Sequence, residues 1–62
     1  PPSSIEEMLK NDIEQEKIDV KHYEKMAELA EKENLIELKL KMEDQAADEQ
    51  GHQMKMERLL KK

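Results

Sequence analysis

Apolar positions recur along the first half of the chain at alternating intervals of four and three residues. The recurring positions are Leu9, Ile13, Glu16, Val20, Tyr23, Ala27 and Ala30. Residues at this spacing line one face of an α-helix, and the spacing is that of helices that pack side by side. Glu16 is the one charged member of the series. The pattern therefore predicts a helix over about residues 4–33, with Glu16 in the middle of its inward face.

A second series with the same spacing follows in the other half of the chain. It consists of Leu35, Leu38, Met42, Gln45, Glu49, His52, Met56 and Leu59. Three polar residues, Gln45, Glu49 and His52, interrupt the middle of this face. The series predicts a second helix over about residues 35–61, with all of these positions facing inward.

Two capping signatures mark where these helices are expected to begin. Ser4 is followed three residues later by Glu7, and Asn34 is followed at the same distance by Glu37. An N-cap side chain with a glutamate three residues later is typical of a helix start. The connection at 33–34 is very short, and helices joined by so short a turn run antiparallel beside one another. The expected fold is all-α, an antiparallel two-helix hairpin.

Length and composition agree with this fold and limit its stability. Of the 62 residues, 44% are charged and 35% hydrophobic, which is the balance of a long helix or coiled coil. Residues 1–62 can form one small domain, and so short a chain rarely buries enough apolar surface to be stable alone. The chain has no Cys and so no disulfide. A metal, a partner chain or both are expected to supply the remaining stability.

The charge pattern excludes several classes of partner. The net charge is −5, with acidic and basic residues interleaved. Nucleic-acid binding is not expected, because there is neither a basic stripe nor a set of aromatic residues for base stacking. No apolar run approaches the roughly 18 residues of a membrane span, and no signal peptide is visible. We expect a cytoplasmic protein without membrane contacts. The chain starts without Met, which suggests processing or a fragment of a longer chain.

Simple helix geometry brings the charged interruptions to one level. Glu16 lies about 17 residues before the turn, while Glu49 and His52 lie about 15 and 18 residues after it. At about 1.5 Å per residue, the height of Glu16 falls between those of Glu49 and His52. Glu49 and His52 are three residues apart on one helical face, so both can reach the same ion. Buried charges cost free energy unless they are paired or bind a metal. The three residues are therefore candidate metal ligands.

The kinds of ligand suggest which metals would bind. Carboxylate oxygens and an imidazole without thiolate suit iron or manganese, and zinc is possible. Three ligands are too few for a pair of metals, but two such hairpins would supply four carboxylates and two histidines. Ferritin-like di-iron and di-manganese bundles have this set, one Glu from each of two helices and Glu-x-x-His from each of the others. Glu-x-x-His alone is a weak signal. A metal-free bundle, in which Glu16 and His52 form a buried ion pair that sets the register, remains the alternative.

Two segments resemble the ligand-bearing helices of the ferritin-like superfamily, closest to the second half of bacterioferritins and to Dps-like ferritins. Residues 12–16 (Asp-Ile-Glu-Gln-Glu) resemble the segment with the metal-binding Glu of the third helix. Residues 48–52 (Asp-Glu-Gln-Gly-His) resemble the Glu-x-x-His segment of the fourth. The resemblance implies that Glu16 is a terminal carboxylate ligand, Glu49 bridges two metals and His52 is a terminal nitrogen ligand.

The resemblance also suggests supporting residues. Tyr23 resembles a tyrosine near the di-iron site of the bacterioferritin first half and would hydrogen-bond a ligand or donate an electron, although a core aromatic is an equal alternative. Gln45, one turn before Glu49, would orient the ligands or would be a polar core residue that fixes the helix register. No haem is expected. Haem-binding bacterioferritins have a Met next to the Glu of the Glu-x-x-His motif in their first half, and Gln50 stands at the corresponding place in the motif of this chain. The five methionines are expected to pack, and His22 to be exposed.

The resemblance implies a ferroxidase-type function, the oxidation of Fe(II) with O₂ or H₂O₂ for iron storage or oxidative-stress protection. The di-iron centre would need a second hairpin, either an identical chain, as in encapsulated ferritins, or a missing N-terminal half. A higher oligomer or cage is expected. Two alternatives stay open, a rubrerythrin-like di-iron peroxidase or oxygenase and a metal-free structural or partner-binding bundle. The sequence does not distinguish iron storage from peroxide detoxification.

Overall fold

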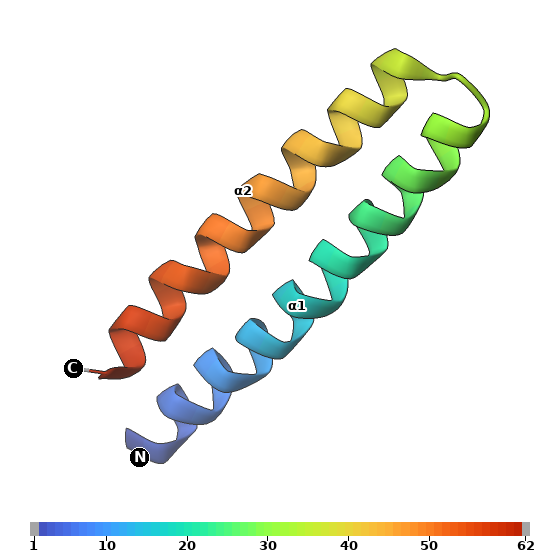
Figure 1. The fold of residues 1–62 in the computed structure, drawn as a ribbon. Coiled ribbons are helices and arrows are strands. Elements are labelled where there is room, and N and C mark those ends of the chain that lie inside the picture. The colour runs from blue at the N-terminus through green and yellow to red at the C-terminus, as the bar shows by residue number, and fades with distance from the viewer. Residues whose placement is uncertain (1, 62) are drawn as a thin grey trace.

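The chain forms two long antiparallel helices joined by a tight turn (Figure 1). In this computed structural model the backbone is described for residues 2–61 and the side chains for residues 4–61. Helix α1 spans Pro2–Lys32 and helix α2 spans Ile36–Lys61. The hairpin is a rod of 49 × 14 × 11 Å with both termini at one end. The predicted all-α hairpin is confirmed. No helix in the described part has the length and apolar character needed to cross a membrane.

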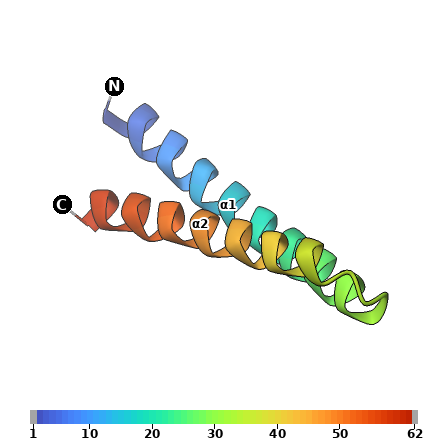
Figure 2. The same ribbon diagram turned by 90° about the horizontal axis from the view of Figure 1, so that it is seen from above.

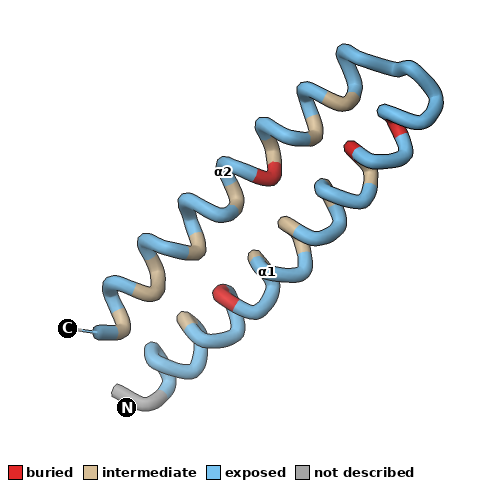
Figure 3. The backbone as a smooth tube through the Cα atoms, viewed as in Figure 1, coloured by how far each residue is buried: buried red, intermediate tan, exposed pale blue. Residues whose placement is uncertain are grey.

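The inward face of α1 follows the predicted series. Ile13, Ala27 and Ala30 are buried, and the other four members are half-buried. In the half of the hairpin nearer the turn, the buried residues are all alanines, Ala27 and Ala30 in α1 and Ala46 in α2 (Figure 3). Seen from above, the helices overlap near the turn and diverge towards the termini (Figure 2). Alanines on both helices allow the close approach near the turn, because they place little bulk between the backbones.

The inward face of α2 differs from the prediction. Leu35, Leu38, His52 and Leu59 were expected to face inward but are exposed. The positions that face α1 are instead Lys39, Met42, Ala46, Glu49, Gln53, Met56 and Leu60. Both series contain Met42, Glu49 and Met56, which form one column along the helix that we call the shared column. The column on one side of these residues, which contains Ala46 and Gln53, contacts α1. The prediction instead placed the column on the other side, which contains His52 and Leu59, against α1.

The turn corrects the predicted role of Asn34. This residue has a φ of 60°, the left-handed conformation that Asn adopts more readily than most residues. Its N–H bonds the carbonyl of Glu31 at 3.1 Å, and the N–H of Leu35 bonds that of Ala30 at 2.8 Å. These two bonds form a Schellman motif, which closes a helix C-terminus. Asn34 therefore ends α1 and does not cap α2, whose first turn is closed by a bond from Lys39 N–H to the Leu35 carbonyl at 2.9 Å.

The start of α1 also differs from the prediction. The helix begins at Pro2, two residues before the expected cap, so Ser4 lies within its first turn. Proline suits this place because its ring presets the helical φ and the missing N–H would have no partner within the helix. The Ser4–Glu7 signature therefore does not mark the helix boundary. Differences of one or two residues at helix ends are common.

The hairpin has two unlike sides. In α2, Leu38, Gln45, His52 and Leu59 form a column three residues after the positions of the shared column. α1 has a corresponding column: Asp19 stands three residues after Glu16, and Met26 stands three residues after Tyr23. Both are half-buried. Because the helices run in opposite directions, the same rotation on each brings both columns to one side of the hairpin. We call this side the open face.

Candidate metal centre

The structure brings Glu16, Glu49 and His52 together at mid-length of the hairpin. Each offers one ligand atom, and these atoms all lie within 4.8 Å of one another. Glu16 comes from α1, while Glu49 and His52 come from consecutive turns of α2. The predicted convergence of these three side chains is thus observed. It arises because the turn length and the 1.5 Å helical rise bring the three residues to one level.

The Glu16 carboxylate is the most constrained of the three groups. Its Oε2 atom is buried and has no hydrogen-bond partner among the described residues. A hydrogen bond between the neutral carboxyl and Glu49 raises the pKa of Glu16, and so do its burial and the charges of Glu49 and Asp19; the charge of His52 acts in the opposite direction. Two crowded carboxylates in a partly buried place favour a proton or a cation between them.

Glu49 and His52 differ in how far they are covered. The Glu49 side chain is 20% exposed, and that of His52 is 60% exposed on the open face. The Nδ1 atom of His52 lies 3.8 Å from Oε1 of Glu49, which is too long for a hydrogen bond. Among the described residues, the carboxylate closest to this imidazole is therefore that of Glu49, on the same helix. The buried Glu16–His52 ion pair of the metal-free alternative does not form in the single hairpin.

The two residues that were expected to support the centre show no hydrogen bond to it among the described residues. Tyr23 and Gln45 are both half-buried, and in the described part neither donates a side-chain hydrogen bond to the three candidate ligands. The Tyr23 ring instead meets His22 edge to face, with 6.2 Å between the ring centroids. His22 is exposed, as its position off the inward series predicts. The roles of Tyr23 and Gln45 at the centre remain predictions.

Asp19 is a neighbour of the centre that the sequence reasoning missed. It is half-buried, one turn after Glu16, and its charge contributes to the raised pKa of Glu16. Gln15 Nε2 donates a hydrogen bond of 3.1 Å to Asp19 Oδ1, which holds the carboxylate in place. The signal was present in the sequence, because Asp19 follows Glu16 at the interval by which His52 follows Glu49.

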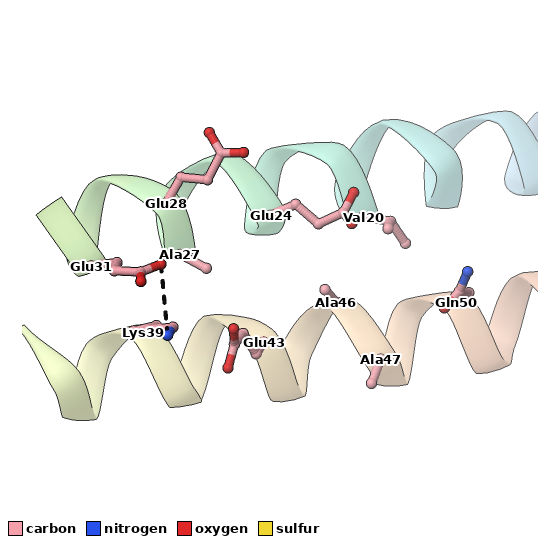
Figure 4. A pocket seen from close by; sticks show the side chains of 10 residues that line it. All are labelled: Val20, Glu24, Ala27, Glu28, Glu31, Lys39, Glu43, Ala46, Ala47 and Gln50. Carbon is pink, nitrogen blue, oxygen red and sulfur yellow. Dashed lines mark ion pairs between the residues drawn. The ribbon is translucent and has the colours of Figure 1, made fainter.

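The opposite side of the hairpin carries a groove with a different character (Figure 4). The groove has a volume of about 390 Å³ and is lined mostly by polar side chains and alanines. Four glutamates line it, namely Glu24, Glu28, Glu31 and Glu43. Lys39 crosses between the helices and pairs with Glu31 at 3.7 Å. No histidine lines this groove, and the candidate ligands lie outside it.

The donor set fits a metal of the iron, manganese or zinc type. Two carboxylate oxygens and one imidazole nitrogen, with no thiolate, are the ligands that these ions accept. The partnerless Oε2 of Glu16 is a group that a cation would satisfy. One hairpin supplies three protein ligands, of which His52 is largely exposed. Comparison with protein-family models, with curated proteins and with solved structures finds no match for this chain.

Proposed function

We propose that this chain is half of a ferritin-like di-iron carboxylate protein that oxidises Fe(II) with O₂ or H₂O₂. The observation that carries the proposal is the convergence of Glu16, Glu49 and His52 from two helices, with a Glu16 oxygen that is buried and without a partner. Iron storage or protection from peroxide would be the biological purpose. A cytoplasmic location is part of the proposal and can be checked by cell fractionation.

A second hairpin is needed to complete the proposed site. His52 is largely exposed on the open face, so a partner docked there can share the metal with it. Leu38 and Leu59 are exposed on the same face and would be buried by that partner. Two identical hairpins related by a two-fold axis would present four Glu and two His ligands. The missing half of a longer chain could take the same place.

In this proposal each residue has a defined task. Glu16 and His52 would be terminal ligands of the metal pair, and Glu49 would be the ligand that both ions share. When bound, the pair of irons supplies the electrons that reduce the oxidant. A cation binds the ionised carboxylate, and the raised pKa of Glu16 favours the neutral form, so metal binding is expected to weaken as the pH falls. Tyr23, seven residues after Glu16, would donate a hydrogen bond or an electron from the next turns of α1.

The alternative functions differ in what the same residues do. In a metal-free structural bundle, Glu16 and Glu49 would share a proton, and the raised pKa of Glu16 is consistent with this arrangement. That pair would fix the helix register in the way that buried polar groups do in coiled coils. A rubrerythrin-like peroxidase or oxygenase would use the same ligands and differ in the oxidant or substrate. We favour a metal centre over the metal-free bundle because the imidazole adds a third ligand at the same place.

The test compares the parent with Glu49→Ala and with Glu43→Ala, a glutamate of the groove on the other side. Iron per chain is measured by elemental analysis on the species isolated by native mass, and Fe(II) oxidation is followed by absorbance. Glu49→Ala is expected to abolish Fe(II) oxidation and to lower bound iron, whereas Glu43→Ala should match the parent. If Glu49→Ala and the parent bind iron equally, the metal proposal is wrong.

A further inference from the structure

The outer surface of α2 carries an apolar stripe that neither the hairpin nor the open face uses. Leu40, Ala47 and Met54 follow one another at intervals of seven residues and are all exposed, Leu40 by 56% and Met54 by 54%. Ile36 flanks the stripe near the turn and is 68% exposed. We call these four residues the outer stripe. In a chain with 44% charged residues, such a row of apolar side chains indicates a surface that is covered.

The outer surface of α1 provides the contrast. Its exposed apolar residues, Ile18 and Leu29, stand eleven residues apart, about 16 Å along the helix. Between them the same surface carries His22 and Lys25. Single exposed apolar residues of this kind are normal and need no partner. The apolar character is therefore a property of α2.

The outer stripe faces away from both other contacts of α2. Leu40, Ala47 and Met54 each stand two positions before a member of the shared column, about 160° round the helix from it, and one position after a member of the Ala46 column, about 100° from it. The open-face column begins at Leu38, and its members lie about 140° from the stripe in the other direction. A partner on the stripe therefore leaves the open face free. Both surfaces can be occupied at the same time.

The stripe is complementary to itself in an antiparallel arrangement. Ala47 lies midway between Leu40 and Met54, seven residues from each. When α2 of a second copy runs antiparallel with the two Ala47 side chains in contact, each Leu40 meets Met54 of the second copy. Gly51 lies beside the stripe, and nothing lies within 4 Å of the position that a Cβ atom would take there. Small residues at the centre allow two helices to approach closely.

Charged residues favour the same register. Glu37 stands ten residues before Ala47 and Arg58 eleven after it, on the same flank of the stripe. In the antiparallel pair, Glu37 of one copy therefore lies within about 1.5 Å of the level of Arg58 of the second copy. In a parallel pair, residues on the same flank lie on opposite sides of the contact, and Glu37 and Arg58 lie at different levels, so they cannot pair. Exposed ion pairs add little affinity, but the antiparallel pair brings these opposite charges together and the parallel pair does not.

We propose that the outer stripe is a self-association surface, on which α2 of a second copy packs antiparallel about Ala47. A single pair of helices covers less than the roughly 1,200 Å² of a standard stable interface, so this contact is expected to be weak by itself. Together with the open-face dimer, which rests on the proposed function, it would link dimers into a larger closed assembly. The stripe itself does not depend on metal binding.

The first experiment measures assembly by native mass and sedimentation over a range of concentrations. The variant Leu40→Glu with Met54→Glu changes the stripe, and Ile18→Glu with Leu29→Glu makes the same change on the outer surface of α1. All four positions are exposed in the hairpin, so circular dichroism should report unchanged helix content. The stripe variant is expected to lower the native mass by about twofold or more, to that of the dimer or below, while the α1 variant keeps the parental mass. Equal masses for the stripe variant and the parent overturn the proposal and leave the stripe to a different protein.

A charge exchange tests the antiparallel register separately. Glu37→Arg alone is expected to weaken assembly about tenfold in concentration, because two arginines then oppose each other. Glu37→Arg with Arg58→Glu restores the opposite pair and should recover the parental assembly. If the double variant stays as weak as the single one, the proposed register is wrong. Iron per chain, measured on the same samples, separates the two proposals. If the parent binds no iron but the stripe variant still has a lower native mass than the parent, the stripe proposal stands and the metal centre is contradicted.

Discussion

The two long sides of the hairpin both carry carboxylates but use them differently. At the edge of the open face, Glu16 and Glu49 lie close together beside the His52 imidazole, and one Glu16 oxygen is buried without a partner. In the groove on the other side, four glutamates are spread over a longer surface, and one of them pairs with Lys39. The number of acidic groups is larger in the groove. Convergence and burial, rather than the density of negative charge, therefore distinguish the candidate metal centre.

The difference has an energetic basis. A solvated carboxylate near a lysine gains little from the pair and costs little if the pair is lost. A carboxylate that is partly buried against another carboxylate is unfavourable until a proton or a cation reaches it. Metal binding on the open face would relieve that cost, whereas the groove has no such cost to relieve. Changes on the open face should therefore have the larger effects.

The largest effect is expected from Leu38→Asp with Leu59→Asp on the open face. Both residues are exposed in the single hairpin, so the hairpin itself should tolerate the change. Burial in a partner would contribute about 1.5–3 kcal/mol for each leucine, and buried charges would cost more than that. We expect a monomer without bound iron, measured by native mass with elemental analysis. A native mass equal to that of the parent would show that the open face is not the dimer interface.

The next effect compares the two histidines of the chain. His52→Ala removes a candidate ligand, whereas His22→Ala removes an exposed imidazole that contacts Tyr23. His52→Ala is expected to weaken metal binding at least about tenfold, which is about 1.4 kcal/mol, and His22→Ala to leave it unchanged. Isothermal titration with Fe(II) without oxygen, or with Mn(II), measures the affinity. Equal affinities for both variants would exclude His52 from the centre.

A pH effect of intermediate size follows from Glu16. Its pKa in the folded protein is raised, so the neutral carboxyl is favoured on folding. The metal-free protein should therefore gain stability as the pH falls from above the raised pKa towards the ordinary value for Glu, with a slope of at most about 1.4 kcal/mol per pH unit. That contribution is lost as the pH rises. Metal binding should show the opposite trend, because it requires the ionised form.

Substitution of Glu16 by Gln tests this sign. Urea unfolding with a chelator present, repeated over pH 4–8, measures the free energy of unfolding. Glu16→Gln should flatten the pH dependence, while Glu24→Gln in the groove should keep the parental slope. A parental slope in Glu16→Gln would mean that a different group causes the pH dependence.

The smallest effect is expected in the groove. Lys39→Met keeps an apolar stem against α1 and removes the pair with Glu31. The free energy of unfolding should change by no more than about 1 kcal/mol, because the pair is partly solvated. Iron content should match the parent. A large loss of iron in this variant would contradict the distinction between the two sides.

Several features followed from the sequence alone because they depend on local spacing. The 4,3 intervals predicted both helices and the buried face of α1, since 3.6 residues per turn leave few other choices. Counting residues from the turn at 1.5 Å each predicted that Glu16, Glu49 and His52 converge. Asp19 could have been found in the same way, from its spacing to Glu16. These features require no knowledge of how the two helices contact each other.

Tertiary structure decided which side of α2 meets α1. The apolar face of α2 is three columns wide, and one neighbouring helix contacts only part of it. The sequence pattern is equally compatible with contact through Leu38, His52 and Leu59 or through Ala46, Gln53 and Leu60, because both sets flank the same shared column. The left-handed conformation of Asn34 and the Schellman motif determine how α2 is rotated as it leaves the turn. That rotation leaves His52 on the open face, where a second hairpin can reach it.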